Sequence, residues 1–348
     1  MIASCFRPKE PAWSARNYFK VAWGHHAADR SFGLLFILLV AGAIALGNSS
    51  FWVSPQTKPT LLAHRGLAQT YPATGLTATT CTAARIFPPE HTFIENTLPS
   101  KRAAFAAGAD IVELDVHPTT DGQIAVFHDW TLDCRTDGHG VTREHGLADL
   151  KNLDVGYGYT ADGGKTFPLR GTGIGLLPSL DEVLSAFLDK RFLIHIKNND
   201  ADEGRRLATR LTSLPQQQLQ RLMVYGGALP VAATRQMLDI PAMSGTTLKR
   251  CLIRYFLLGW SGYVPPDCER SVLLVPVNYA PWLWGWPNRF LNRMNDHGST
   301  VFITGRHDGE DFSSGIDRPE DLALLPSGFA GGIWTNRIDR IAPLLRQC

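Results

Sequence analysis

The sequence lacks the features that mark several classes of protein. Its six cysteines include no CxxC pair and no tetrahedral zinc spacing, which excludes a structural zinc site. Neither sign of charge is in excess, because 34 Lys and Arg stand against 32 Asp and Glu, and this balance excludes a basic nucleic-acid-binding protein. No GxGxxG or Walker motif follows the first predicted strand, and no solenoid repeat or low-complexity tail is present. The 348 residues, 44% hydrophobic and 19% charged, instead have the composition of one large globular domain or two ordinary ones.

Long apolar runs are also rare, and the sequence has one, at residues 31–47. Extended to residue 53, this run approaches the ~20 residues that a membrane-spanning helix needs. We therefore expect a transmembrane signal anchor over 31–53, preceded by a cytoplasmic N-terminal segment over 1–30. Basic residues precede the run and few charges follow it, so the positive-inside rule puts the rest of the chain outside the cytoplasm, in a periplasmic or extracellular space. A cleaved signal peptide and a buried core helix are the alternatives.

The spacing of the cysteines is compatible with disulfides. Cys81 could pair with Cys134, and Cys251 with Cys268, in an oxidising compartment. Sequence alone does not fix the connectivity, and buried free thiols are the alternative.

Short aliphatic and β-branched runs recur from residue 60 onward, separated by helix-like stretches. This alternation is typical of parallel strands joined by crossover helices. It predicts an α/β fold, namely a (β/α)8 TIM barrel over 60–345 that follows the N-terminal helix in sequence. A doubly wound sheet is the alternative, but it would usually carry a glycine-rich phosphate loop after its first strand. The predicted strands are 60–64, 111–116, 124–128, 192–197, 222–225, 272–277, 301–304 and 332–335, with 241–244 as a weaker ninth.

Two acidic side chains lie on one face of the strand 111–116. Side chains alternate along a strand, so Glu113 and Asp115 project together while their neighbours are apolar. Like charges on a buried face raise each other's pKa unless a cation compensates them, which suggests a hard divalent metal such as Ca²⁺ or Mg²⁺. A solvated edge strand carrying two acids is the alternative.

Histidines and cations follow the strand ends. His64 and His128 each end a predicted strand, where the active-site residues of a barrel gather, and histidine can serve as general acid or base near neutral pH. Arg65 offers bidentate donors for a phosphate. His195 and Lys197 repeat the i, i+2 spacing on another strand. Together these residues describe a metal-assisted site for an anionic, oxygen-rich substrate, most simply a phosphate ester.

Four motifs in this order resemble the glycerophosphodiester phosphodiesterase family. They are His64-Arg65-Gly66, Glu95-Asn96-Thr97, the stretch from Gly108-Ala109-Asp110 through Glu113 and Asp115 to Asp121-Gly122, and His128-Asp129 followed by Thr131-Leu132-Asp133. Weaker similarity extends through Leu177–Leu180 to Ile333–Asn336. The resemblance implies a TIM barrel that hydrolyses glycerophosphodiesters to glycerol 3-phosphate and an alcohol, through a cyclic phosphate that water opens.

The resemblance also implies a role for each site residue. His64 and His128 resemble the family's acid–base pair, and Arg65 and Lys197 the cations that contact the phosphate. Glu113 and Asp115 resemble the metal ligands, and Glu95 an acidic residue that lines the same site as ligand or orienter. His195 stands where the family usually has a glutamate ligand, so we place it in the predicted metal set of Glu95, Glu113, Asp115 and His195. Imidazole suits softer metals than Ca²⁺, so the sequence does not decide between a hard ion such as Ca²⁺ or Mg²⁺ and a softer one.

Two further departures from the family concern the surface. The insertion Leu67–Ile94 separates the first two motifs and could form a lid or narrow the mouth. The segment Leu252–Phe290 carries the cluster Trp282-Leu283-Trp284-Gly285-Trp286, which could face a bilayer or pack against the barrel helices. We therefore expect a membrane-tethered phosphodiesterase. A lysophospholipase D acting at the membrane surface and a catalytically silent lipid-binding barrel are the alternatives, and we expect no nucleic-acid partner.

Overall fold

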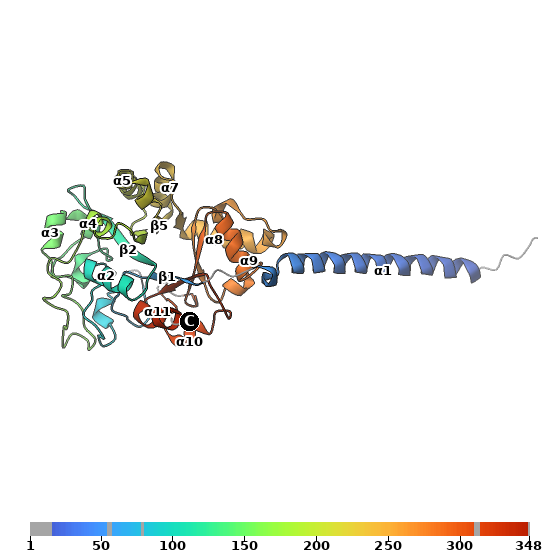
Figure 1. Ribbon diagram of the computed structural model, residues 1–348, viewed down its shortest axis with the longest axis horizontal. Helices are drawn as coiled ribbons and strands as arrows, with labels where there is room; N and C mark the ends of the chain where they lie inside the picture. The colour runs from blue at the N-terminus through green and yellow to red at the C-terminus, as the bar shows by residue number, and fades with distance from the viewer. Residues whose placement is uncertain (1–15, 54–57, 78–79, 310–313, 347–348) are drawn as a thin grey trace, which may run out of the picture. The chain divides into compact units, whose positions relative to one another are not determined.

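The computed structural model describes residues 16–53, 58–77, 80–309 and 314–346, with the backbone alone for residues 16–31. The chain divides into two compact units, residues 1–48 and 49–348. The first unit contains one long helix, α1 (Arg16–Gly47), drawn in blue in Figure 1. Of the predicted cytoplasmic segment, residues 1–15 lie outside the described residues.

The predicted transmembrane helix over 31–53 is not supported. In the part of the chain that the structure describes, no helix has both the length and the apolar character that a membrane crossing requires. Helix α1 ends at Gly47 and does not continue to residue 53. The chain instead forms a separate 3₁₀ turn, η1 (Ser50–Trp52), where the Ser49 hydroxyl accepts a hydrogen bond from the Phe51 backbone N–H.

The second unit is a barrel of parallel strands. Their order is β6-β5-β4-β2-β1-β9-β8-β7, and each neighbouring pair in this path is parallel. The barrel is nearly closed: at the two ends of this path, the Ala242 backbone N–H of β6 donates to the carbonyl of Arg270, two residues before β7, at 3.1 Å. The prediction of a TIM barrel is therefore confirmed. Its strands are β1 (Thr60–Ala63), β2 (Ile111–Pro118), β4 (Arg191–Ile196), β5 (Leu222–Gly226), β6 (Ala242–Ser244), β7 (Val272–Pro276), β8 (Thr300–Thr304) and β9 (Gly332–Thr335).

One predicted barrel strand lies elsewhere. β3 (Ile124–Val126) pairs antiparallel with β2 and is off the barrel path. The five residues between β2 and β3 are too few for the crossover that joins parallel strands, so the chain forms a hairpin. The weaker candidate at 241–244 supplies the missing barrel strand, β6. His128 therefore follows the hairpin strand rather than a barrel strand.

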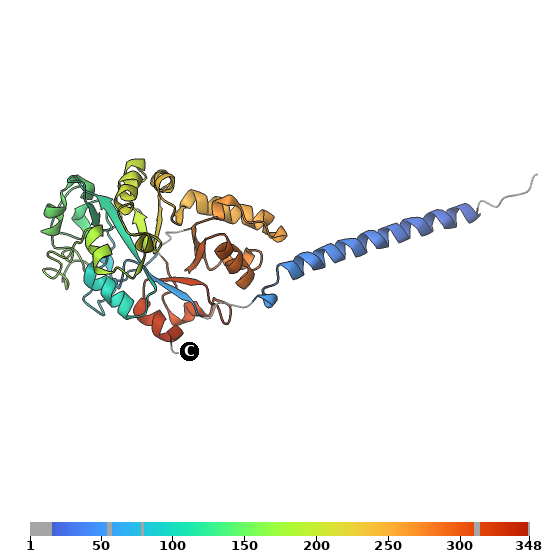
Figure 2. The ribbon, with the colours of Figure 1, turned by 45° about the horizontal axis from the view of Figure 1, so that its top comes forward.

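Helices surround the strands, as Figures 1 and 2 show for the second unit. Their inward faces complete a core in which strand residues such as Leu62, Leu114 and Ile194 are fully buried. The helices are α2 (Leu98–Ala106), α3 (Leu147–Lys151), α4 (Leu180–Ala186), α5 (Ala201–Leu211), α6 (Gln216–Leu219), α7 (Ala228–Met237), α8 (Gly245–Leu258), α9 (Asn288–Asp296), α10 (Pro319–Leu322) and α11 (Ile338–Arg346). The shorter 3₁₀ turns are η2 (Ala83–Arg85), η3 (Leu132–Cys134), η4 (Thr142–Glu144), η5 (Gly259–Ser261), η6 (Pro266–Cys268) and η7 (Ala280–Trp282).

Both predicted cysteine pairs are disulfides. Cys81 bonds to Cys134, and Cys251 bonds to Cys268. The first bond ties the insertion Leu67–Ile94 to the η3 turn beyond the hairpin. The alternative of free thiols is therefore wrong for these four residues.

Candidate active site

The register of three neighbouring strands builds the centre of the site. Asp115 of β2 lies opposite His195 of β4, and His195 lies opposite Tyr225 of β5. The His195 and Tyr225 rings stack, with centroids 4.1 Å apart. Tyr225 also donates its phenolic O–H to Glu113 at 2.7 Å. Strand register thus places two acids, an imidazole and a phenol side by side inside the barrel. We call these residues, Glu113, Asp115, His195 and Tyr225, the row.

A strained turn positions the residues after β1. Arg65 has φ +60°, and Gly66 has φ +89°. A Cβ on Gly66 would lie 2.2 Å from the Ser100 hydroxyl of α2, so this position accepts only glycine. The turn aims the Arg65 backbone N–H at the Glu113 carboxylate, 3.1 Å away. Backbone strain of this kind, held by surrounding contacts, is common at functional sites.

Three candidate metal ligands converge at the row. Ligand atoms of Glu113, Asp115 and His195 all lie within 4.8 Å of one another. Two carboxylates and an imidazole form a donor set that proteins use for divalent cations, with the nitrogen favouring a softer ion over Mg²⁺ or Ca²⁺. These residues therefore fit the ion that the family resemblance implies. Glu95 is not part of the cluster.

The two acids of the cluster ionise differently. Burial, followed by the charge of Asp115, raises the pKa of Glu113 to about 8, against the opposing effect of Arg65. Burial also acts to raise the pKa of Asp115, but Lys197, His128 and Arg65 outweigh it and hold that pKa well below its usual range. The raised pKa of Glu113 reflects burial first and the adjacent Asp115 charge second, and a bound divalent cation would oppose both effects.

His64 is held as a neutral imidazole. Its Nδ1–H donates to the Asn336 side-chain oxygen at 2.6 Å, and its Nε2 accepts from Arg65 Nε at 3.1 Å. Burial, and next the charge of Arg65, lowers the pKa of His64 well below its usual value. Because the partners fix the tautomer, the proton-accepting atom Nε2 faces the cluster, 3.9 Å from a Glu113 oxygen.

His128 has a partner of opposite character. Its Nδ1 lies 2.5 Å from the Asp129 carboxylate, which in turn lies 3.0 Å from Arg135 Nε. Burial, and then Arg65 and Lys197, lower the pKa of His128 to about 3 in the absence of ligands. Asp129 opposes this shift, because a carboxylate stabilises an imidazolium. The two histidines therefore differ in their Nδ1 partners: His64 lies beside the neutral amide of Asn336, and His128 lies beside the carboxylate of Asp129.

Two arginines bind the acid that the sequence places among the metal ligands. Glu95 lies 3.1 Å from Arg65 and 3.3 Å from Arg135. Burial acts to raise the pKa of Glu95, but Arg135 and Arg65 outweigh it and lower that pKa. Glu95 thus contacts Arg65 and Arg135, and this arrangement favours the second of the two roles that the resemblance implies, that of an orienting residue.

The cations face the cluster. Arg65 Nε and Lys197 Nζ each lie 3.4 Å from a different oxygen of Asp115. Both are therefore close enough to contact an anion bound at the same place. Seven of the eight predicted site residues are Glu113 and Asp115 themselves or contact one of these acids directly or through one side-chain partner. The eighth, His128, is linked to Asp115 through the backbone, because the neighbouring Phe127 N–H donates to the Asp115 carbonyl at 3.1 Å.

Sequence reasoning assigned no role to four residues that complete the site. Asn336 and Asp129 were visible within motifs, and each follows a candidate residue or strand directly. No local sequence pattern indicates that Tyr225 or Arg135 belongs to the site, because their contacts depend on strand register and on the path of the loop after β3. Their partners lie far away in sequence, as the separation of 112 positions between Tyr225 and Glu113 illustrates.

Adding Mg²⁺ or Mn²⁺ to the metal-stripped protein is expected to raise its melting temperature, and more at about pH 8.5 than at about pH 5.5. Without metal, Glu113 keeps a proton to about pH 8 in the folded chain. A glutamate in the unfolded chain loses its proton near ~4.3. The folded state therefore binds more protons across this window, and its stability falls as the pH rises. Above about pH 8 Glu113 is ionised, and a bound cation then neutralises the charge that the proton neutralised at lower pH.

Thermal melts with EDTA or with each metal at both pH values measure this effect. At about 100 times its Kd, a ligand stabilises the folded state by about 2.7 kcal/mol. Glu113→Gln should weaken the metal response and remove its pH dependence. Identical melting temperatures with EDTA, Mg²⁺, Mn²⁺ and Ca²⁺ at both pH values would contradict the metal assignment.

Known proteins match the region that contains this site. Residues 64–214 match the model of the glycerophosphoryl diester phosphodiesterase family. A glycerophosphodiester phosphodiesterase of Bacillus subtilis is 32% identical over 182 residues, which are 48% of this chain and 53% of that protein. One of Caldanaerobacter subterraneus is 39% identical over 103 residues, 30% of this chain and 39% of that protein. The chain thus spans about half or less of these relatives.

Solved structures match over a larger part of the chain. A glycerophosphoryl diester phosphodiesterase domain from Mycobacterium tuberculosis has a TM-score of 0.56 at 18% identity, covering 82% of this chain and 99% of that one. An Oleispira antarctica phosphodiesterase in complex with sn-glycerol-3-phosphate has a TM-score of 0.51 at 17% identity, covering 83% and 97%. This likeness supports the barrel fold. The match over 64–214 supports the family resemblance predicted from the four motifs, and this region is similar to the glycerophosphoryl diester phosphodiesterase family.

Proposed function

We propose that this protein hydrolyses glycerophosphodiesters to glycerol 3-phosphate and an alcohol. One observation carries the proposal: two neutral histidines with fixed Nδ1 partners stand at a buried cluster of two acids and two cations. The match of residues 64–214 to the family model supports it, as does the similarity to relatives named glycerophosphodiester phosphodiesterase.

The partners of the two histidines suggest a division of work. Asn336 is uncharged and leaves His64 neutral, which suits a general base that accepts the proton of the attacking hydroxyl at Nε2. Asp129 is anionic and stabilises a protonated imidazole, which suits His128 as the general acid for the leaving alcohol. The negative charge of a bound phosphodiester would raise the pKa of His128 toward the working range.

The reaction then has two steps with balanced protons. In the first, the glycerol hydroxyl forms a bond to phosphorus and gives its proton to His64, while the bond to the alcohol breaks and the alcohol takes a proton from His128. In the second, water opens the cyclic phosphate with the two histidines in exchanged roles. Arg65 and Lys197 hold the phosphate oxygens. A divalent cation held by Glu113, Asp115 and His195 would supply further stabilisation of charge on those oxygens.

Purified protein is expected to release glycerol 3-phosphate from glycerophosphocholine or glycerophosphoethanolamine when Mg²⁺, Mn²⁺ or Ca²⁺ is supplied. A coupled glycerol 3-phosphate assay measures the product. Removal of the metal with EDTA should abolish the release, and its return should restore it. A protein that turns over no diester with any of these metals would favour the alternative of a silent lipid-binding barrel.

An exposed apolar surface favours a second candidate, a lysophospholipase D. This surface comprises Ile253, Phe256, Leu257, Leu258, Trp260 and Trp282. Trp284 joins its two parts, because its indole N–H donates to the Phe256 carbonyl at 2.8 Å. The tryptophan cluster is thus divided, with Trp282 69% exposed while Trp284 and Trp286 pack against the core. Exposed tryptophans are typical of proteins that contact lipid headgroups. Choline release from lysophosphatidylcholine vesicles but not from glycerophosphocholine would favour this candidate.

We also propose that the barrel works outside the cytoplasm. The two disulfides support this location, because such bonds persist in oxidising compartments and are rare in the cytosol. Alkylation of intact cells before lysis, followed by mass spectrometry, tests it. The four bonded cysteines should remain unlabelled until the protein is reduced.

A further inference from the structure

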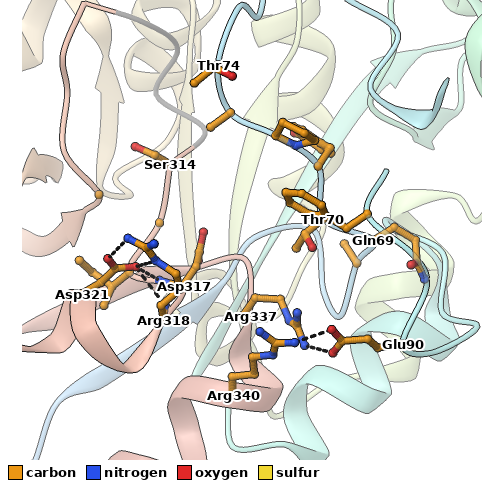
Figure 3. Close-up of a pocket in the computed structure, with 18 of the residues that line it drawn as sticks. Gln69, Thr70, Thr74, Glu90, Ser314, Asp317, Arg318, Asp321, Arg337 and Arg340 are labelled. Carbon is orange, nitrogen blue, oxygen red and sulfur yellow. Dashed lines mark hydrogen bonds and ion pairs between the residues drawn. The ribbon is translucent and has the colours of Figure 1, made fainter. Parts of the chain in front are cut away.

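A large cavity opens beside the candidate active site. It has a volume of about 1010 Å³ and is lined by the insertion at 68–74 and 87–91, by residues 314–318, and by Gly305, Arg306, Asp308, Asp321, Leu324, Arg337 and Arg340. Figure 3 shows Gln69, Thr70 and Thr74 on one wall and Ser314 and Asp317 on another. We call it the side pocket.

The side pocket adjoins a smaller cavity beside the catalytic residues. This smaller cavity, of about 90 Å³, is lined by His64, Arg65 and Asn336. The two cavities share wall residues, among them Tyr71 and Asp317. A phosphodiester bound between the histidines would therefore extend one of its two substituents into the side pocket.

The charged side chains of the side pocket balance one another. Its described lining holds four arginines and four carboxylates. Glu90 of the insertion pairs with both Arg337, at 2.7 Å, and Arg340, as Figure 3 shows. Arg318 pairs with Asp321 at 2.9 Å. Such paired groups offer many hydrogen-bond donors and acceptors but no net charge, so the pocket has no means to select a cationic or anionic group.

Flat apolar surfaces complete the lining. Tyr71 and Phe87 supply aromatic rings, and Pro72, Pro88 and Pro89 supply rigid apolar faces. Aromatic faces that accept C–H groups, next to side chains that bond to hydroxyls, suit an uncharged molecule with many hydroxyl groups. Pockets for drug-sized ligands measure ~300–1,000 Å³, so this cavity has room for a ring-sized substituent.

We propose that the side pocket receives the alcohol part of the substrate, and that this alcohol is a bulky uncharged polyol of the cyclitol or sugar class. This inference rests on the proposed function. The insertion Leu67–Ile94 supplies the aromatic wall, and the pairing of Glu90 with Arg337 and Arg340 holds that wall against the chain near α11. The insertion thereby sets the choice of alcohol.

A comparison of two substrates tests the proposal with the full chain. The kcat/KM for glycerophosphoinositol should exceed that for glycerophosphoethanolamine at least about tenfold, which corresponds to about 1.4 kcal/mol of selective binding. The difference should lie mainly in KM, because the side pocket binds the substituent without touching the reacting atoms. Initial rates by the coupled glycerol 3-phosphate assay give both constants.

Variants separate the pocket from the catalytic groups. Phe87→Ala, at a side chain that is 50% exposed, should raise KM for the inositol substrate about tenfold and raise KM for the ethanolamine substrate much less. Glu90→Gln should have a smaller effect in the same direction. Tyr263→Ala is a matched control, because Tyr263 is also 50% exposed but lies outside the pocket lining.

The outcomes distinguish this inference from the proposed function. Equal efficiency with both diesters, or a preference for inositol that Phe87→Ala does not alter, would overturn the side-pocket inference and leave the function intact. Absence of hydrolysis of either diester with any divalent metal would overturn both.

Discussion

His128→Asn is expected to lower kcat for glycerophosphodiester hydrolysis by about 10²–10⁴-fold, with a much smaller change in KM. The proposed general acid contributes only while the leaving alcohol takes up its proton, so its loss affects the transition state rather than substrate binding. Asparagine retains a polar side chain beside Asp129, whose charge is also balanced by Arg135 at 3.0 Å. Steady-state kinetics on diesters with alcohols of different pKa measure the loss, which should be smallest for the most acidic alcohol.

Asp129→Asn separates positioning from proton transfer. The variant keeps an acceptor for Nδ1–H but removes the charge that stabilises an imidazolium, so the pKa of His128 should fall further. A general acid is active in its protonated form, and the alkaline limb of the pH–kcat profile should therefore move to lower pH. A purely structural role would lower kcat without moving that limb.

His145→Asn is a suitable control for both variants. Its ring faces the His139 carbonyl at 3.1 Å and takes no part in the cluster. The control should keep kcat within about twofold of wild type. If His128→Asn behaved like this control, the assignment of the general acid would be wrong.

The strands and the chemistry-bearing residues were accessible from the sequence because they depend on local patterns. Alternation along 111–116 was enough to put Glu113 and Asp115 on one face, and both are fully buried with their ligand atoms close together. The family motifs indicated which strand ends carry histidines. The short connection before β3 also contained the signal for a hairpin, which the strand count had missed.

The residues that tune the site were not accessible in the same way. Asn336 reaches His64 because β9 pairs with β1, which joins positions 272 residues apart. Tyr225 reaches Glu113 because β2, β4 and β5 are in a particular register. Such contacts are set by the closure of the whole barrel, and no short segment of sequence encodes them.

The side pocket gives a second example of the same limit. The sequence shows Leu67–Ile94 as an insertion relative to the family, and it predicts that this insertion forms a lid or narrows the mouth of the barrel. Its actual effect depends on one disulfide, Cys81–Cys134, and on the pairing of Glu90 with Arg337 and Arg340. These long-range ties connect the insertion, which lines the side pocket, to distant parts of the chain.

Lys101→Met is expected to stabilise the folded protein by roughly 4 kcal/mol at about pH 6, and by much less at about pH 10. Lys101 lies on α2 with a side chain that is 0% exposed. Its Nζ has no hydrogen-bond partner among the residues that the structure describes. Burial lowers its pKa to about 7, against the opposing charges of Glu113, Asp115 and Glu95. An unpaired buried ammonium of this kind is costly to keep charged.

The sign of the pH dependence follows from proton binding. A lysine in the unfolded chain has a pKa of about 10.4. Between about pH 7 and pH 10 the unfolded state therefore holds a proton that the folded state has released, and the stability of the wild type rises with pH across this window. Below it, the folded state carries the full cost of the buried charge. Methionine removes the titrating group while keeping a flexible apolar side chain of similar length.

Urea unfolding of both proteins at the two pH values measures the difference, and each comparison between variant and wild type cancels the other titrating groups. Lys249→Met, at an exposed lysine on α8, is the matched control and should shift neither midpoint. If Lys101→Met were equally destabilising at both pH values, the Lys101 ammonium would be compensated in the folded protein and would serve as a structural cation for the carboxylates. The pH difference, rather than the change at either pH, therefore decides between a tolerated buried charge and a required one.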